Sequence, residues 1–270
     1  MNGNPIFDSK NQAQTWGTKK SQNPVGFHNA PQMSASQLED MYQQPAATGA
    51  DTGRMTIGDT INKTIITLAL VAVGAGLGWI MPMLMLPGAI VGLVLGLVNA
   101  FKKQPSPPLI LAYALAQGAF LGGLSMFLNS LYPGVAIQAL VASLAVAGTT
   151  LALYRSGKYR MSPKLNKMFF IAMIGMIVFS LLNFVLMMTG AIEGMFGLRS
   201  AGGGMLGLVI GVLAVLLATY ALVSDFTMIE DLSNRGAPAI MAWRGAFGLT
   251  MTLVWMYVEI LRILSILRGD

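Results

Sequence analysis

Three charged residues stand inside long apolar runs, where charged side chains are rare. Glu259 and Arg262 belong to WMYVEILRIL (255–264), and Asp225 follows ALVS at the end of another apolar run. A charged side chain at the centre of a membrane helix costs about 2.5–3.5 kcal/mol on insertion scales, so it usually has a function. Acidic residues at this depth are typical of proton relays and cation pathways. These three residues are therefore the first candidates for chemistry in the chain.

Each acid also has a purely structural interpretation. Arg262 follows Glu259 by three residues, so the two side chains lie on one face of a helix and can form an ion pair. Asp225 is followed by Glu230 and Asp231, so it can be a solvated residue at the end of its helix. The residues alone leave both the functional and the structural interpretation open.

The chain lacks the residues that most enzyme classes need. His28 is the only histidine and lies in the polar N-terminal region, and there is no cysteine. A buried Ser–His pair, a zinc site and thiolate chemistry are therefore excluded. An intramembrane aspartyl protease would share a proton between two carboxylates, but such enzymes resemble each other in a GxGD stretch, and Asp225 lies in ALVSDF. We expect no enzymatic activity and no bound cofactor.

The elements that position these residues must be membrane helices. Of 270 residues, 54% are hydrophobic and only 10% are charged, whereas an average soluble domain has roughly 25% charged residues. Crossing a bilayer core requires about 20 apolar residues. Runs of this kind occur at 64–81, 83–101, 109–129, 135–154, 168–190, 205–225 and 247–267. The sequence thus predicts an all-α polytopic membrane protein with seven transmembrane helices.

The N-terminal region differs from the rest of the chain. Residues 1–56 are rich in Asn, Gln, Ser and Pro and lack the apolar core and cleavage site of a signal peptide. Such a composition cannot bury enough apolar surface to fold by itself. We expect a disordered cytoplasmic tail at 1–56, followed by a transmembrane domain at 57–270.

The basic residues predict the orientation of the helices. Fourteen of the seventeen Lys and Arg residues lie before the first span or in the second, fourth and sixth loops, while the first and third loops have none and the fifth has only Arg199. Because loops rich in Lys and Arg stay in the cytoplasm, the N-terminus is expected to be cytoplasmic. This distribution explains the net charge of +6 without a nucleic-acid partner.

Glycines spaced by four residues predict close helix packing. They place hydrogen-only side chains on one face of a helix, so that two backbones can approach. The glycines with this spacing are Gly74 and Gly78, Gly92 and Gly96, Gly118 and Gly122, and Gly203, Gly207 and Gly211.

Three segments together resemble the transmembrane Bax inhibitor motif family, in its bacterial branch related to Bax inhibitor-1 and YccA. They are SPPLILAYALAQGAFLGGLS (106–125), VSDFTMIED (223–231) and WMYVEILRIL (255–264), and the seven spans follow in the same order over about residues 57–268. The resemblance implies a helical bundle whose last helix is surrounded by the other six. It also implies a pH-sensitive cation leak, with Ca²⁺ as the expected ion, in the bacterial plasma membrane.

The same resemblance assigns a gate to Asp225 and Glu259. Two close carboxylates would share a proton, titrate as a coupled pair and hold the last two helices together. Loss of the proton would separate the helices and leave oxygen ligands for a transient Ca²⁺ ion. Arg262 or Lys102 would tune or latch this pair. The residues expected to pack near the pore are Gln117, Gly118, Gly122, Asn183 and Tyr220.

The spacing of the two acids requires a further element. Asp225 and Glu259 are 34 residues apart, and helices that met directly at Gly236 would place them at depths differing by roughly 18 Å. PAIMAWRGAFG (238–248) begins with proline and contains Trp, Arg and two glycines. We therefore predict an interfacial segment there, which would bring the acids level.

A second function remains open, in which the chain is an interaction protein that modulates a membrane-bound ATP-dependent protease, as bacterial relatives are thought to do. The long N-terminal tail favours this function, because a channel does not need one. The expected partners are thus membrane lipid and, through the tail, such a protease.

Overall fold

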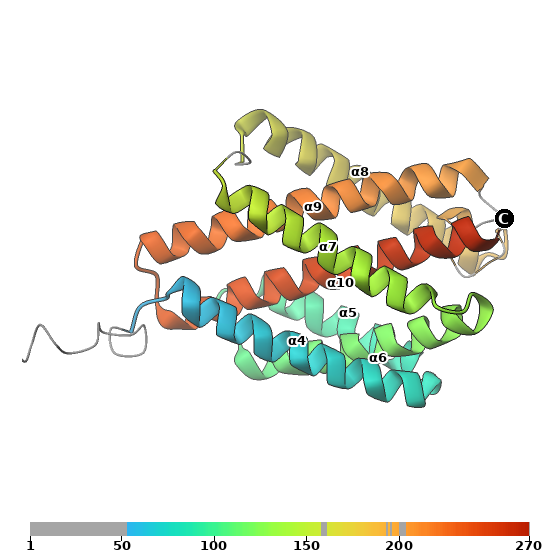
Figure 1. Ribbon diagram of the computed structural model, residues 1–270, viewed down its shortest axis with the longest axis horizontal. Helices are drawn as coiled ribbons and strands as arrows, with labels where there is room; N and C mark the ends of the chain where they lie inside the picture. The colour runs from blue at the N-terminus through green and yellow to red at the C-terminus, as the bar shows by residue number, and fades with distance from the viewer. Residues whose placement is uncertain (1–52, 158–160, 193, 195, 200–203, 270) are drawn as a thin grey trace, which may run out of the picture. The chain divides into compact units, whose positions relative to one another are not determined.

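Seven long α-helices make up most of the described part of the chain in the computed structural model (Figure 1). The structure describes residues 53–157, 161–192, 194, 196–199 and 204–269. The helices are α4 (Ile57–Ile80), α5 (Met85–Phe101), α6 (Pro107–Leu131), α7 (Val135–Arg155), α8 (Pro163–Met188), α9 (Gly204–Asn234) and α10 (Ala242–Gly269). Short 3₁₀ turns are η3 (Pro82–Leu84), η4 (Gly197–Arg199) and η6 (Ala239–Met241). No strand occurs in the described ranges, and all seven helices are long and apolar enough to cross a membrane, which confirms the predicted fold class.

Helix α4 extends beyond its predicted apolar run because polar residues continue it. Thr56 caps α4, its Oγ1 atom accepting a hydrogen bond from the backbone N–H of Asp59 at 3.1 Å. Asp59 also pairs with Lys63 at 2.7 Å, four residues later on the same helix face. Helical hydrogen bonding does not require apolar side chains, so α4 begins seven residues before the apolar run that predicted it.

The last helix is central. Fifteen residues of α10 are buried, whereas Asn183 is the only buried residue among those described in α8. The main contacts of α10 are with α4, α6, α7 and α9, while α5 packs mainly on α6 and α8 packs mainly on α9 and η4. The predicted central position of the last helix is therefore confirmed, but four helices rather than six form most of its surroundings.

Two helices of the bundle touch through their glycines. Gly74 and Gly78 in α4 face the backbone of α6, and Gly118 and Gly122 in α6 face the backbone of α4. A Cβ atom at any of the four would overlap a carbonyl group of the other helix. The glycine spacing therefore brings these two backbones into contact, as it predicted.

The connection between α9 and α10 is short and compact. Gly236 adopts a positive φ of 64° after α9, and α10 already begins at Ala242 after the turn η6. The predicted interfacial segment at 238–248 is therefore wrong, because its last seven residues belong to α10. Its glycines serve close packing: Gly245 lies against Ile229 of α9, and Gly248 lies against Asp225.

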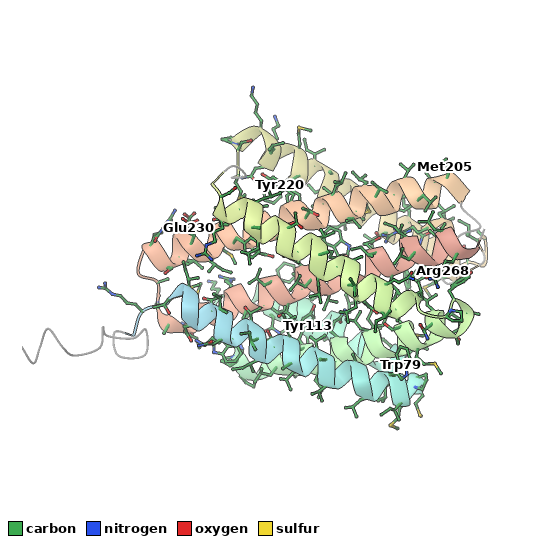
Figure 2. All side chains as sticks on the ribbon, viewed as in Figure 1. Trp79, Tyr113, Met205, Tyr220, Glu230 and Arg268 are labelled. Carbon is green, nitrogen blue, oxygen red and sulfur yellow. The ribbon has the colours of Figure 1, made fainter. Side chains whose placement is uncertain are left out.

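The segment before α4 is hydrogen-bonded to the connection between α9 and α10. The backbone N–H of Met55 donates to the carbonyl of Ala237 at 2.7 Å, and Met55 is buried. We call this end of the bundle the basic end, because the loops with most of the Lys and Arg residues join helices there. Figure 2 shows Glu230 near this end and Met205 and Arg268 at the opposite end. The predicted disordered tail lies outside the described residues up to position 52.

Candidate functional site

Glu259 lies in α10 and accepts hydrogen bonds from the side chains of two arginines. Its Oε2 atom accepts hydrogen bonds from Arg262 Nη2 at 2.6 Å and Arg262 Nε at 3.2 Å. Its Oε1 atom accepts from Arg199 Nη2 and, at 3.3 Å, from the indole N–H of Trp255. Glu259 is only 2% exposed and Arg262 only 1%. We call Arg199, Glu259 and Arg262 the arginine–glutamate cluster. Because all these hydrogen bonds come from N–H donors, Glu259 acts purely as an acceptor.

Arg262 also fastens other parts of the chain to α10. Its Nη1 atom donates to the carbonyl of Arg199 at 2.9 Å and to the carbonyl of Gly207 at 3.1 Å. Gly211, one turn further along α9, leaves room for the guanidinium, since a Cβ atom there would lie 3.0 Å from Arg262 Nη2. The planar fork of donors thus joins η4 and the first turns of α9 to the central helix.

Arg199 reaches the cluster because the connection before α9 is held in place. The Asn183 side chain accepts from the backbone N–H of Leu198 at 2.8 Å and donates to the carbonyl of Phe196 at 3.1 Å. Gly197, between them, adopts a positive φ of 56° and is buried against Asn183. Asn183 therefore positions the turn η4, which carries Arg199.

The sequence patterns did not indicate Arg199 as a site residue. Its one signal is its charge, because it is the lone basic residue in the first, third and fifth loops, which lie on the side that is otherwise free of Lys and Arg in its loops. In the structure its side chain is 16% exposed and is paired with Glu259. Arg199, the one basic residue in loops that otherwise have none, thus forms an ion pair inside the bundle.

Asp225 lies elsewhere along the α9–α10 interface. Its Oδ2 atom accepts a hydrogen bond from the Thr252 hydroxyl at 2.7 Å, and its Oδ1 atom faces Gly248. Within the described part of the chain, Asp225 has no ion pair. Thr252 precedes Glu259 by seven residues, which is roughly 10 Å along a helix.

The predicted Asp225–Glu259 pair is therefore wrong. The short connection makes α9 and α10 antiparallel neighbours, so Asp225 is level with Gly248 and Thr252 and not with Glu259. A Ca²⁺ site formed jointly by these two carboxylates is wrong for the same reason. Over the described ranges, no group of three or more His, Cys, Asp or Glu side chains gathers to hold a metal ion.

Of the two basic residues expected to tune the acids, only Arg262 contacts one. Lys102 is exposed at the end of α5, and the contact recorded for it is its backbone carbonyl, which accepts from Arg244 Nη2 at 3.3 Å. Lys102 belongs to the basic end, whereas Glu259 lies in the other half of α10. No described contact joins Lys102 to Asp225 or Glu259, and its latch role stays a prediction.

The residues expected near the pore pack helices together. Gln117 lies against Gly92 at the contact of α5 with α6, next to Gly118 and Gly122, which meet α4. The Tyr220 hydroxyl donates to Asn166 Oδ1 at 2.7 Å, which ties α9 to the first turn of α8 (Figure 2). No hydrogen bond described for these residues reaches Asp225 or Glu259.

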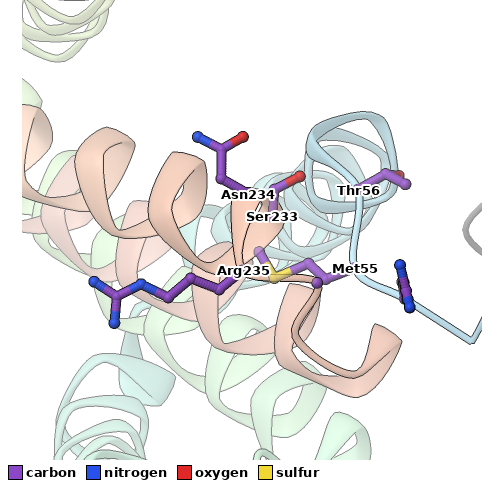
Figure 3. A pocket seen from close by; sticks show the side chains of 7 residues that line it. Met55, Thr56, Ser233, Asn234 and Arg235 are labelled. Atoms are coloured by element: carbon purple, nitrogen blue, oxygen red, sulfur yellow. The ribbon is translucent and has the colours of Figure 1, made fainter. Parts of the chain in front are cut away.

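A cavity of about 410 Å³ lies at the basic end, and Figure 3 shows the side chains that line it. Its labelled lining residues are Met55, Thr56, Ser233, Asn234 and Arg235. The Arg235 side chain extends away from Thr56 and Met55. Because the polar groups do not converge, this cavity lacks the arrangement that fixes a small ligand.

Comparison with known families covers nearly the whole chain. The sequence model of the family described as Bax inhibitor 1 like matches residues 4–269. The match includes all seven helices and the three segments that carry the resemblance, which is thereby confirmed. A comparison with curated proteins finds no match.

Proposed function

We propose that this chain, which belongs to the Bax inhibitor 1 like family, is a pH-sensitive cation leak of the bacterial plasma membrane that passes Ca²⁺. The proposal rests on the position of Asp225 and on its hydrogen bonding. This carboxyl group lies between the central helix and α9, and its described hydrogen-bond partner is a neutral hydroxyl. A carboxyl group without an ion pair can exchange a proton for a cation. Glu259 is less suited to this role, because two arginines already bind it.

Protonation of Asp225 would close the leak. As a neutral acid, Asp225 remains bonded to Thr252 and the two helices stay packed at Gly248. As a carboxylate, it offers hard oxygen atoms beside the Thr252 hydroxyl, and Ca²⁺ prefers oxygen ligands. The leak is therefore expected to increase as the pH rises and to decrease as the pH falls.

The arginine–glutamate cluster would form the barrier in the other half of α10. Two guanidinium groups and one carboxylate give it a formal net charge of +1, which repels cations. Arg199 would be the movable member of this barrier, because it belongs to the turn η4 and not to a long helix. A cation that has reached Asp225 would pass when this turn moves away from α10.

Ca²⁺ flux into liposomes that contain an indicator dye tests the proposal. The wild-type chain should pass Ca²⁺ more rapidly at higher pH, and Asp225→Asn should remove this pH dependence. Asp231→Asn is the matched control, since Asp231 is exposed on the same helix and should leave the profile unchanged. Absence of flux in the wild-type chain, or an unchanged profile in Asp225→Asn, would contradict the proposal.

A further inference from the structure

A second cavity opens beside the arginine–glutamate cluster. Its volume is about 310 Å³, at the lower end of the range for small-molecule sites. Arg199, Glu259 and Trp255 line its polar side, and Met173, Ile177 and Ser180 of α8 line the other. The cavity therefore combines an apolar wall from one helix with a charged wall from α10 and η4.

The charge on the polar side is not balanced by the described residues. Arg199 and Arg262 are permanently charged, and Glu259 is the one acid that pairs with either of them. The Nε atom of Arg199 is buried and has no hydrogen-bond partner among the described residues. Buried donors are nearly always bonded, and an unbalanced buried charge is costly. Both features point to an absent acceptor with negative charge.

The other wall of the cavity faces hydrocarbon. Of the residues of α8, only Asn183 is buried, and large apolar side chains such as Ile174 and Ile177 are more than half exposed. In a helix of this hydropathy, these exposed side chains meet lipid chains. A ligand that reaches the cavity past α8 must therefore itself carry a hydrocarbon chain.

We propose that this cavity binds an amphiphilic anion. Its negatively charged oxygen headgroup binds to Arg199, and one hydrocarbon chain lies along Met173 and Ile177. Two kinds of molecule have this chemistry, free fatty acids and the anionic phospholipids of the membrane. The proposal concerns binding alone, so it stands or fails independently of whether the chain conducts ions.

Trp255 provides a probe inside the cavity. The full-length chain has four tryptophans, and replacing Trp16, Trp79 and Trp243 by Phe leaves Trp255 as the only one. Bromine atoms quench nearby indole fluorescence, so dibromostearate should quench Trp255 with a saturable dependence on its concentration. The uncharged dibromostearyl alcohol has the same chain and should quench only weakly and without saturation.

Two substitutions in the cavity test the binding mode against a control on the same helix. Arg199→Gln removes the charge and should weaken dibromostearate binding by about tenfold or more, as expected for a hydrogen bond to a charged group. Ser180→Phe fills the cavity and should abolish saturable quenching while keeping every charge. Val178→Phe adds the same ring to an exposed position of α8 and should bind like the parent chain. Thermal unfolding in detergent checks that each variant is folded.

The source of the ligand is distinguished in nanodiscs. Brominated phosphatidylglycerol that quenches Trp255 in the parent chain but not in Ser180→Phe would identify a membrane phospholipid, whereas quenching by dibromostearate alone would identify a fatty acid. Either result supports the proposal. Equal quenching by the acid and the alcohol, or unchanged quenching in both Arg199→Gln and Ser180→Phe, would overturn it.

Discussion

All three nitrogen atoms of the Arg262 guanidinium group donate hydrogen bonds inside the bundle. The single ammonium group of a lysine could not make the same set of bonds. Nε and Nη2 both donate to Glu259 Oε2, and Nη1 donates to the backbone carbonyls of Arg199 and Gly207. A single residue thus joins α10, η4 and α9. The pairing with Glu259 follows from the spacing of three residues, but the carbonyl contacts depend on tertiary structure and have no sequence pattern.

Arg262→Lys should therefore be strongly destabilising, although it keeps the charge. An ammonium group cannot reach Glu259 and both carbonyls together, and breaking a buried pair costs about 3–5 kcal/mol. Thermal unfolding in detergent should show a much lower Tm for Arg262→Lys than for the wild-type chain. Arg268→Lys is the matched control, because Arg268 is exposed near the end of the same helix. Similar Tm values for both variants would contradict the role assigned to Arg262.

At the scale of elements, hydropathy and proline placement predict all seven helices, because crossing a bilayer requires long apolar runs. The helix ends are harder to predict, since a cap such as Thr56 or a turn such as η6 lies outside the apolar signal. Helix rise indicates that Asp225 and Glu259 lie at different depths, and in the structure Asp225 contacts Gly248 and Thr252 of α10. The added interfacial segment fails, because Gly245 and Gly248 pack inside the α9–α10 contact and do not bend the chain.

The turn η4 is the element whose position decides the barrier, and Asn183 holds it. Asn183→Leu keeps the volume of the side chain but removes the hydrogen bonds to Phe196 and Leu198. Leaving these backbone groups unpaired costs about 1–3 kcal/mol for each group. Hydrogen–deuterium exchange should become faster in the peptide that contains residues 196–199.

Thr189→Val serves as the control for this measurement. Thr189 is exposed at the end of α8, and its hydroxyl donates to Leu186 of the same helix. Exchange at residues 196–199 should therefore match the wild-type chain. Protection that is unaffected by Asn183→Leu would show that η4 is held by other contacts.

At the scale of the whole molecule, most of the described basic residues gather at the end of the bundle where residues 53–56 meet the α9–α10 connection. The positive-inside rule predicts that this end is cytoplasmic, and the tail would then extend into the cytoplasm. The tail is the feature that favours the alternative role as an interaction protein, while the proposed leak rests on residues of the helical domain.

Deleting residues 1–50 separates the two roles. The deletion keeps Met55, whose backbone bonds to Ala237, so the helical domain retains its described contacts. The leak proposal predicts Ca²⁺ flux and pH dependence close to those of the full-length chain in liposomes. Loss of flux upon deletion would mean that the tail contributes to conduction, which the proposal does not allow. Loss of binding to a membrane-bound protease, with normal flux, would support the interaction role in addition.

The most direct test of the account compares the two acids in one flux assay. A proton-sharing pair requires that Asp225→Asn and Glu259→Gln both abolish the pH dependence of Ca²⁺ flux. The structure separates the acids, so we expect Asp225→Asn to abolish it and Glu259→Gln to retain it. The double variant Glu259→Gln/Arg199→Gln, which leaves fewer unpaired charges, should retain it as well and guards against unfolding of the single variant. Loss of the pH dependence in the folded double variant, or its persistence in Asp225→Asn, would contradict the account.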